Sequence, residues 1–330
     1  MVVAVNRSMK NEADAMPDGI LRRMLARDEQ PIIMDGGMGS TIEDHGIDVR
    51  SAMWGSYCFV DGLGREINDQ IHADYVAAGA RILIANTHNT RRAKCAEFLE
   101  KLNPSELPES VAAVASSERL EVLHRWLHEQ AVDSAKKAIP AIAEVAVASC
   151  LGSVEPLGPY AQESQITGEE ACRRFVPELQ VRRNSGVDLI IFETLTTRCE
   201  IEGVARLARE HDVGDFAVGL TCGSGGETLA RVSMAEVADI LGDTKPLIYF
   251  VQCTRCEYVK AALEKLQSNL QTTDSVGVYA NDSRVWKNRD WQGERISPRE
   301  YAKQAISWKR MGARVIGGCC GIGPEHIAEL

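Results

Sequence analysis

The stretch Arg314-Val315-Ile316-Gly317-Gly318-Cys319-Cys320-Gly321 has the pattern of a short buried strand that runs directly into two adjacent cysteines. Its β-branched residues favour a strand, and its glycine pair lets the backbone approach whatever lies at the strand's end. Two neighbouring thiols can bind a soft metal ion, but a zinc site needs at least three protein ligands. The best third ligand is Cys253, because it also ends an apolar segment, residues 246–253.

Strand and helix patterns alternate along the rest of the chain regularly enough to be counted. We expect eight strands, at residues 31–35, 81–87, 144–150, 187–193, 215–222, 246–253, 275–281 and 314–320. Eight strands alternating with helices over about 300 residues predict an α/β fold, a single (β/α)8 TIM-type barrel with parallel strands.

Polar side chains collect at one end of these predicted strands. The residues at the C-terminal strand ends are Asp35, Asn86, Glu193, Cys222, Cys253, Asn281, Cys319 and Cys320. Active sites of (β/α)8 barrels are built at this end, so the pattern predicts a single site there. Gly36 and Gly37 follow Asp35, and their backbone amides could face a ligand.

The ends of the chain and its composition indicate how the protein is organised and which partners it has. Residues 1–16 are polar and aperiodic, which predicts a flexible tail, and residues 17–330 are expected to form the barrel, with a short N-terminal helix plugging one end. The net charge of -10 and the absence of long basic runs argue against nucleic acid. We find no bilayer-length apolar run and no signal peptide, so we expect a cytoplasmic protein without membrane contact, whose ten cysteines are mostly reduced.

Three thiolates on one Zn²⁺ leave the fourth tetrahedral position open, as in catalytic zinc sites. A thiol that binds there loses its proton, whereas a free thiol is only a few per cent ionised at neutral pH. The sequence therefore predicts a zinc site that prepares a thiol for attack on an alkyl donor.

Several motifs together resemble the homocysteine S-methyltransferases, zinc enzymes that methylate homocysteine to methionine. They occur in the family's order and span roughly residues 30–330. They are Met34-Asp35-Gly36-Gly37-Met38-Gly39-Ser40, Ala85-Asn86-Thr87, Phe192-Glu193-Thr194, Cys253-Thr254, and Gly317-Gly318-Cys319-Cys320-Gly321 with Gly323-Pro324-Glu325-His326-Ile327.

The resemblance implies that Cys253, Cys319 and Cys320 are the zinc ligands and catalytic residues, with homocysteine bound through its sulfur. Glu193 would pair with the substrate ammonium, and Asp35 with Gly36 and Gly37 would seat the amino-acid end. The charges of these groups support this assignment, because a carboxylate accepts charge-assisted hydrogen bonds from an ammonium and backbone amides donate hydrogen bonds to a carboxylate. Further substrate-binding residues are expected at Asn86, Thr87, Trp54 and Asn281.

The methyl donor must be activated, because a thiolate does not displace methyl from a neutral amine at useful rates. The 330 residues leave no room for folate or cobalamin modules, which favours S-methylmethionine, S-adenosylmethionine or a related sulfonium or betaine. Trp54 could face the donor cation with a cation–π contact of about 0.5–2 kcal/mol. The chain departs from the family pattern at His88, Asn89, Thr194 and Gln252, which leaves the donor open.

Alternative interpretations remain for several residues. Cys253-Thr254-Arg255-Cys256 also has the spacing of a redox pair. Glu193 could be a helix-start carboxylate, Asp35 could bind only turn amides, and Trp54 could be core. Asn86, Thr87 and Asn281 could only brace the rim, and Cys222 could be either pocket or core. The rival function is a non-catalytic zinc- or thiol-binding, redox-sensing barrel; in either case we expect small-molecule partners and a monomer or small homo-oligomer.

Overall fold

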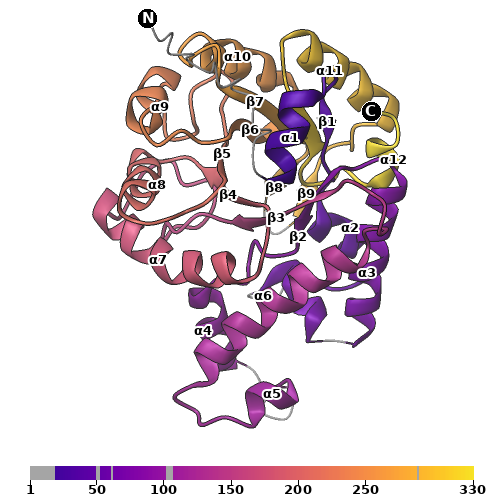
Figure 1. Cartoon of the computed structure of the whole chain (residues 1–330), viewed down its shortest axis with the longest axis vertical. Helices are drawn as coiled ribbons and strands as arrows, with labels where there is room; N and C mark the ends of the chain where they lie inside the picture. Colours follow the sequence, from indigo (N-terminus) through magenta and orange to yellow (C-terminus); the bar gives the residue numbers. More distant parts are fainter. Residues whose placement is uncertain (1–18, 50–52, 61, 102–106, 288–289) are drawn as a thin grey trace, which may run out of the picture.

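A computed structural model describes residues 19–49, 53–60, 62–101, 107–287 and 290–330. Eight parallel strands form the centre, and helices surround them (Figure 1). The predicted tail, residues 1–16, lies outside the described residues. The eight strands are β1 Ile32–Ile33, β2 Ile82–Ala85, β3 Ala146–Leu151, β4 Leu189–Leu195, β5 Phe216–Leu220, β6 Ile248–Arg255, β7 Ser275–Asn281 and β10 Val315–Gly318.

The sheet closes on itself, which confirms the predicted barrel. The strand order is β1-β10-β7-β6-β5-β4-β3-β2, and every pair is parallel. The two ends of this order meet through a parallel bridge between Met34 and Ile82, and the amide of Asp35 donates to the carbonyl of Ile82 at 3.0 Å. The C-terminal ends of all eight strands therefore surround one opening.

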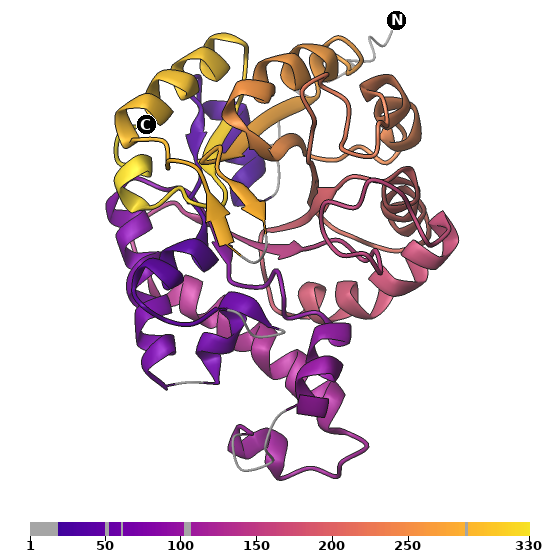
Figure 2. The same ribbon diagram turned by 180° about the vertical axis from the view of Figure 1, so that it is seen from behind.

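The helices cover the outside of the barrel, and Figure 2 shows them from behind. They are α1 Ile20–Arg27, α2 Met38–Asp44, the 3-10 turn η1 Trp54–Phe59, α3 Gly62–Ala77, α4 Arg92–Lys101, α5 Glu109–Ala112, α6 Arg119–Lys137, α7 Gly168–Asn184, α8 Arg198–Glu210, α9 Met234–Leu241, α10 Cys256–Gln267, α11 Pro298–Arg310 and α12 Pro324–Ile327. Ser233 and Glu236 cap the start of α9 with reciprocal hydrogen bonds, and Ser297 and Glu300 do the same for α11.

The structure differs from the sequence expectations in a few elements. Thr167 and Glu170 have the sequence spacing of a capping box, and Thr167 accepts from the amide of Glu170, but the Glu170 carboxylate pairs with Arg173 and Arg174 instead of completing the box. The backbone after β7 forms an antiparallel hairpin, β8 Val285–Lys287 with β9 Asp290–Gln292, which the sequence did not suggest. No helix among the described residues is long and apolar enough to cross a bilayer.

Helix α1 plugs the N-terminal end of the barrel. Leu21 and Met24 are 1% and 0% exposed and belong to the cluster of inward-facing side chains that fills the barrel. Polar contacts fix the helix to the strand starts: Arg22 pairs with Asp215, and Arg314 donates to the carbonyls of Leu25 and Asp28. Figure 1 shows α1 across the barrel centre, on the side away from the hairpin.

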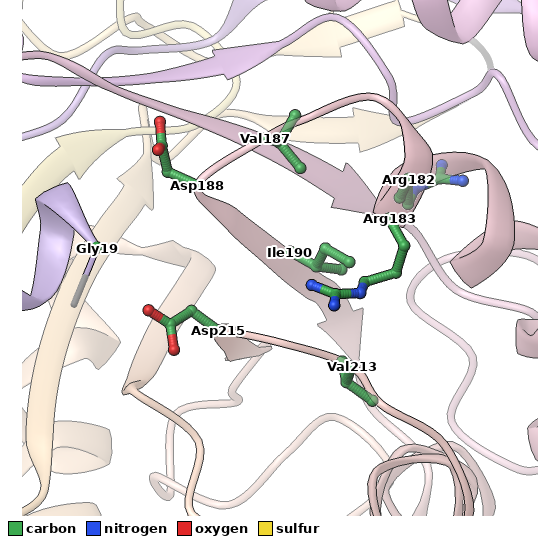
Figure 3. A pocket seen from close by; sticks show the side chains of 8 residues that line it. All are labelled: Gly19, Arg182, Arg183, Val187, Asp188, Ile190, Val213 and Asp215. Atoms are coloured by element: carbon green, nitrogen blue, oxygen red, sulfur yellow. The ribbon is translucent and has the colours of Figure 1, made fainter.

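A cavity of about 240 Å³ lies at this same N-terminal end, between the start of α1 and the starts of β4 and β5 (Figure 3). Its charged groups already have partners: Asp215 pairs with Arg22, Arg183 pairs with Asp212, and Asp188 accepts from the amide of Val147. The strand ends that carry the predicted site residues lie at the opposite end, so this cavity is not the candidate site.

If α1 closes the barrel, replacing Leu21 with alanine should lower the free energy of unfolding by about 2–5 kcal/mol, because it leaves a hole in a filled interior. The matched control is Ile142→Ala, since Ile142 is 99% exposed and its loss should cost less than about 0.5 kcal/mol. Urea unfolding curves of the two variants would measure this, and equal stabilities would contradict the packing of α1.

Candidate functional site

Three cysteine side chains meet at the C-terminal end of the barrel. Cys253 lies in β6, and Cys319 and Cys320 follow β10; β7 pairs with both strands. The sulfur of Cys320 lies 3.9 Å from that of Cys253 and 3.9 Å from that of Cys319, and all three sulfurs lie within 4.8 Å of one another. Zn–S bonds of about 2.3 Å in a tetrahedral site separate two sulfurs by about 3.8 Å. The thiol cluster thus fits a single zinc ion.

The backbone of β6 is bent where it presents Cys253. Cys253 has a φ of 47°, and the register between β6 and β7 shifts between Gln252 and Arg255. Asn281 donates its side-chain amide to the carbonyl of Cys253 at 3.0 Å. Asn281, predicted to bind substrate, is therefore engaged in holding the turn that carries a thiol.

The glycine turn after β1 packs against the cysteine loop, backbone to backbone. A Cβ atom on Gly37 would lie 2.5 Å from the carbonyl oxygen of Cys319, and one on Gly36 would lie 2.2 Å from that of Ile322. The amide of Gly37 donates to Ile322 at 2.9 Å. These glycines let two loops approach, and the Gly37 amide is already used within the protein.

The three thiols differ in how readily each loses its proton. Hydrogen bonds from Cys319 and Cys320 hold the pKa of Cys253 well below its usual range, and the contacts with Cys253 raise the pKa values of Cys319 and Cys320 well above theirs. The close sulfurs thus favour one thiolate and resist further ionisation, because like charges repel. A divalent cation would remove that resistance.

Tyr160 also reaches the thiol cluster, and sequence reasoning missed it. Its hydroxyl lies 2.9 Å from the sulfur of Cys253, its φ is 71°, and the residue is 39% exposed. Tyr160 lies in the long loop after β3, and loops of this length in compact domains are usually functional. Nothing in the sequence indicated which of its side chains would turn inward.

Glu193 is the charged centre of a second group next to the thiols. It lies in β4, is 6% exposed, and accepts from His88 Nδ1 at 2.5 Å and from the Tyr279 hydroxyl at 3.2 Å. Burial alone would raise the pKa of Glu193, but the hydrogen bond and charge of His88 outweigh it and lower the pKa below its ordinary value. Glu193 is therefore held as a carboxylate.

His88, Cys150 and Glu193 place one donor atom each within 4.8 Å of one another. Two nitrogen or oxygen ligands on one zinc ion would lie about 3.3 Å apart, however, given bonds of about 2.0–2.1 Å. The 2.5 Å contact of His88 with Glu193 is instead a short hydrogen bond. Burial also raises the pKa of the Cys150 thiol well above its usual range, so we do not regard this group as a metal site.

Asp35 is buried at the end of β1 with only half of its carboxylate satisfied. Its Oδ2 accepts from the amide of Ile84 at 2.7 Å, and its Oδ1 has no hydrogen-bond partner among the described residues. Burial raises the pKa of Asp35 well above its ordinary value. A buried acceptor without a partner costs about 1–3 kcal/mol, which a bound cation would relieve.

Three other predicted residues contact the scaffold. Asn86 donates to the carbonyl of Gly55 and to Asn68, and Thr87 donates to the carbonyl of Cys150. The Trp54 ring approaches His88 edge-on, with 6.3 Å between ring centroids. Asn86 and Thr87 thus hold the loops around the rim, while Trp54 borders the imidazole.

Cys222 and Cys256, two further cysteines near the strand ends, are buried. Burial raises the pKa of Cys222 and that of Cys256 to about 12 in each case. The thiol of Cys256 donates to the carbonyl of Asn281 at 3.2 Å. The sulfur of Cys253 lies with those of Cys319 and Cys320, so among the described residues the structure does not bring Cys253 and Cys256 together as a redox pair.

Comparisons with known proteins bear on the family and the fold of this chain. A family model described as Homocysteine S-methyltransferase matches residues 32–330. Homocysteine S-methyltransferase YbgG of Bacillus subtilis is 26% identical, covering 91% of this chain and 93% of the relative, and the Escherichia coli homocysteine S-methyltransferase is 26% identical, covering 93% and 96%. The crystal structure of the metallated Escherichia coli homocysteine methyltransferase MmuM superposes with a TM-score of 0.73 at 22% identity, covering 94% of this chain and 98% of that one, and supports the fold.

If the glycine turn positions the thiol cluster, Gly37→Ala should weaken zinc retention by about 10–100-fold, because the added methyl group displaces the Cys319 carbonyl. Gly62→Ala is the control, since a Cβ atom there meets nothing within 4 Å. Zinc release to a chromogenic chelator would measure the effect. Equal retention in both variants would show that the turn does not set the cysteine geometry.

Proposed function

Because this chain belongs to the homocysteine S-methyltransferase family, we propose that it moves a methyl group from an onium donor to homocysteine, giving methionine, in a zinc-dependent reaction. The donor is S-methylmethionine, S-adenosylmethionine or a related sulfonium or betaine. The observation that carries the zinc proposal is the convergence of three sulfurs within 4.8 Å at the barrel's C-terminal end.

Cys253, Cys319 and Cys320 would hold Zn²⁺. The ion would supply deprotonation of the acceptor thiol at the remaining tetrahedral position. The homocysteine sulfur then forms a bond to the donor's methyl carbon as the bond from that carbon to the onium atom breaks, and the donor leaves as a neutral sulfide or amine. Tyr160 lies beside this site, with its hydroxyl 2.9 Å from the sulfur of Cys253.

The amino-acid end of homocysteine would lie against Asp35 and Glu193. Asp35 Oδ1 is buried without a partner, and Glu193 is held ionised beside the thiols. An ammonium group would satisfy Asp35 and gain a charge-assisted hydrogen bond, and it would keep both carboxylates ionised. Trp54 would border the donor cation, and Asn86, Thr87 and Asn281 would fix the loops that carry the binding groups.

We further propose that the protein acts in the cytoplasm as a monomer or small homo-oligomer. The support is compositional: ten cysteines at irregular spacing in a long chain fit a reducing compartment, and the acidic surplus fits a solvated surface.

Replacing Cys319 with alanine, or stripping zinc with a chelator, should abolish methionine formation. A zinc site of this kind needs three protein ligands and one open position, and the variant keeps only two of the three thiols. Activity would be measured with homocysteine and a panel of methyl donors, which also identifies the donor. Cys199→Ala is the control, since Cys199 lies in α8 away from the thiols, and it should keep full activity.

Full activity of Cys319→Ala would count decisively against the proposal. Zinc binding without turnover on any donor would favour the rival, a thiol- or zinc-binding barrel.

Asp35→Asn should raise the stability of the ligand-free protein while impairing binding. The raised pKa means that the unfolded carboxyl, with its ordinary pKa near 3.8, ionises more readily than the native one, so stability falls as pH rises above that value. Asparagine does not ionise and so removes this loss, which is worth about 1.4 kcal/mol for each pKa unit by which the native carboxyl exceeds the unfolded one. The same change should raise the homocysteine KM about tenfold or more, because the charged partner of the ammonium is lost.

Asp188→Asn is the matched control, because Asp188 also accepts from a strand amide but lies at the opposite end of the barrel. Its KM should equal that of the wild type. A wild-type KM in Asp35→Asn would remove Asp35 from the substrate site.

A further inference from the structure

His88 is placed to make a second contact that the protein itself does not use. Its Nδ1 is committed to Glu193, while its Nε2 has no hydrogen-bond partner among the described residues, and its side chain is 23% exposed. Gly152 makes room for the ring, because a Cβ atom there would lie 2.6 Å from Cε1 of His88. The imidazole is thus held at one nitrogen and open at the other.

Several groups near His88 that could bind a carboxylate are already engaged. Glu193 and Asp35 can take the ammonium of an amino acid, whereas its carboxylate needs a donor. The Gly37 amide is occupied by the Ile322 carbonyl. Two nearby arginines are also engaged: Arg91 donates to the carbonyl of Ser153, and Arg182 donates to the carbonyl of Cys150 and to Glu178.

The location of His88 suits the acceptor's amino-acid end. Its partner Glu193 is joined to the thiol side of the rim through Tyr279, and the neighbouring Thr194 amide donates to Gln252, whose side chain contacts the Cys319 sulfur at 3.6 Å. A thiol bound at the cysteines and carrying its charged groups a few atoms away would bring them to this part of the rim.

We propose that His88 determines acceptor specificity by donating a hydrogen bond from Nε2 to the carboxylate of an α-amino-acid thiol while Nδ1 holds Glu193. An imidazolium has donors at both nitrogens, and paired with Glu193 it adds no net charge to the site. A zwitterion then finds opposite charges for both its groups. This inference rests on the proposed acceptor and adds the residue that selects it.

Two analogues separate the two ends of homocysteine: 3-aminopropane-1-thiol lacks the carboxylate, and 4-mercaptobutanoate lacks the ammonium. Their binding to the zinc-loaded protein is measured by calorimetry, together with KM and kcat where methyl transfer occurs. The wild type should prefer homocysteine over 3-aminopropane-1-thiol by about tenfold or more. A wild type without that preference overturns the inference, whatever the variants do.

Two variants then test His88 itself. His88→Asn keeps a donor near the Nδ1 position, so its preference over 3-aminopropane-1-thiol should fall about tenfold, chiefly in KM, while its preference over 4-mercaptobutanoate stays within about twofold. His88→Gln keeps a donor near the Nε2 position and should retain more of the first preference. Melting temperatures check that both variants fold.

An unchanged preference over 3-aminopropane-1-thiol in both variants overturns the inference alone. So does a loss that falls on the comparison with 4-mercaptobutanoate, which would mean that Nε2 serves the ammonium. A wild-type protein that binds no homocysteine overturns the proposed function and this inference together.

Discussion

The site depends on the close approach of two loops that are distant in sequence. The loop after β1 and the loop after β10 pack backbone against backbone, and neither Gly36 nor Gly37 leaves room for a side chain there. Because β10 pairs with both β1 and β7, and β7 pairs with β6, this contact also fixes Cys319 and Cys320 relative to Cys253. The two glycines at this contact therefore allow the closed barrel to set the positions of the three sulfurs.

The two carboxylates of the site are prepared in opposite ways. Glu193 is kept ionised by His88 and by the Tyr279 hydroxyl, so its charge is compensated before any ligand arrives. Asp35 is buried with one unpartnered oxygen, and its pKa is raised because nothing compensates its charge. A cationic ligand gains more binding free energy at Asp35 than at Glu193, since it supplies the hydrogen-bond partner and the positive charge that Asp35 lacks.

The sequence predicted the features that depend on local pattern. All eight strands, the N-terminal plug and the C-terminal positions of the cysteines follow from apolar periodicity and from barrel topology. It missed Tyr160, whose position depends on a long loop, and the pairing of His88 with Glu193, which depends on side-chain direction across two strands. The predicted amide role for Gly37 overlooked a backbone contact with Ile322 that only the folded barrel creates.

The rim divides into two halves with different chemistry. The sulfur half comes from β6, β7 and β10, and its backbone is held by hydrogen bonds such as that from the Asn281 side-chain amide to the Cys253 carbonyl. The charged half comes from the ends of β1, β2 and β4, where Asp35, His88 and Glu193 lie. Side chains link the halves through Tyr279 to Glu193 and through Gln252 to Cys319, and the pairing of β1 with β10 links them through the backbone. A change at His88 or Glu193 can therefore alter which molecule is held while the sulfur geometry persists, because the sulfur positions depend on strand pairing and on the glycine turn after β1.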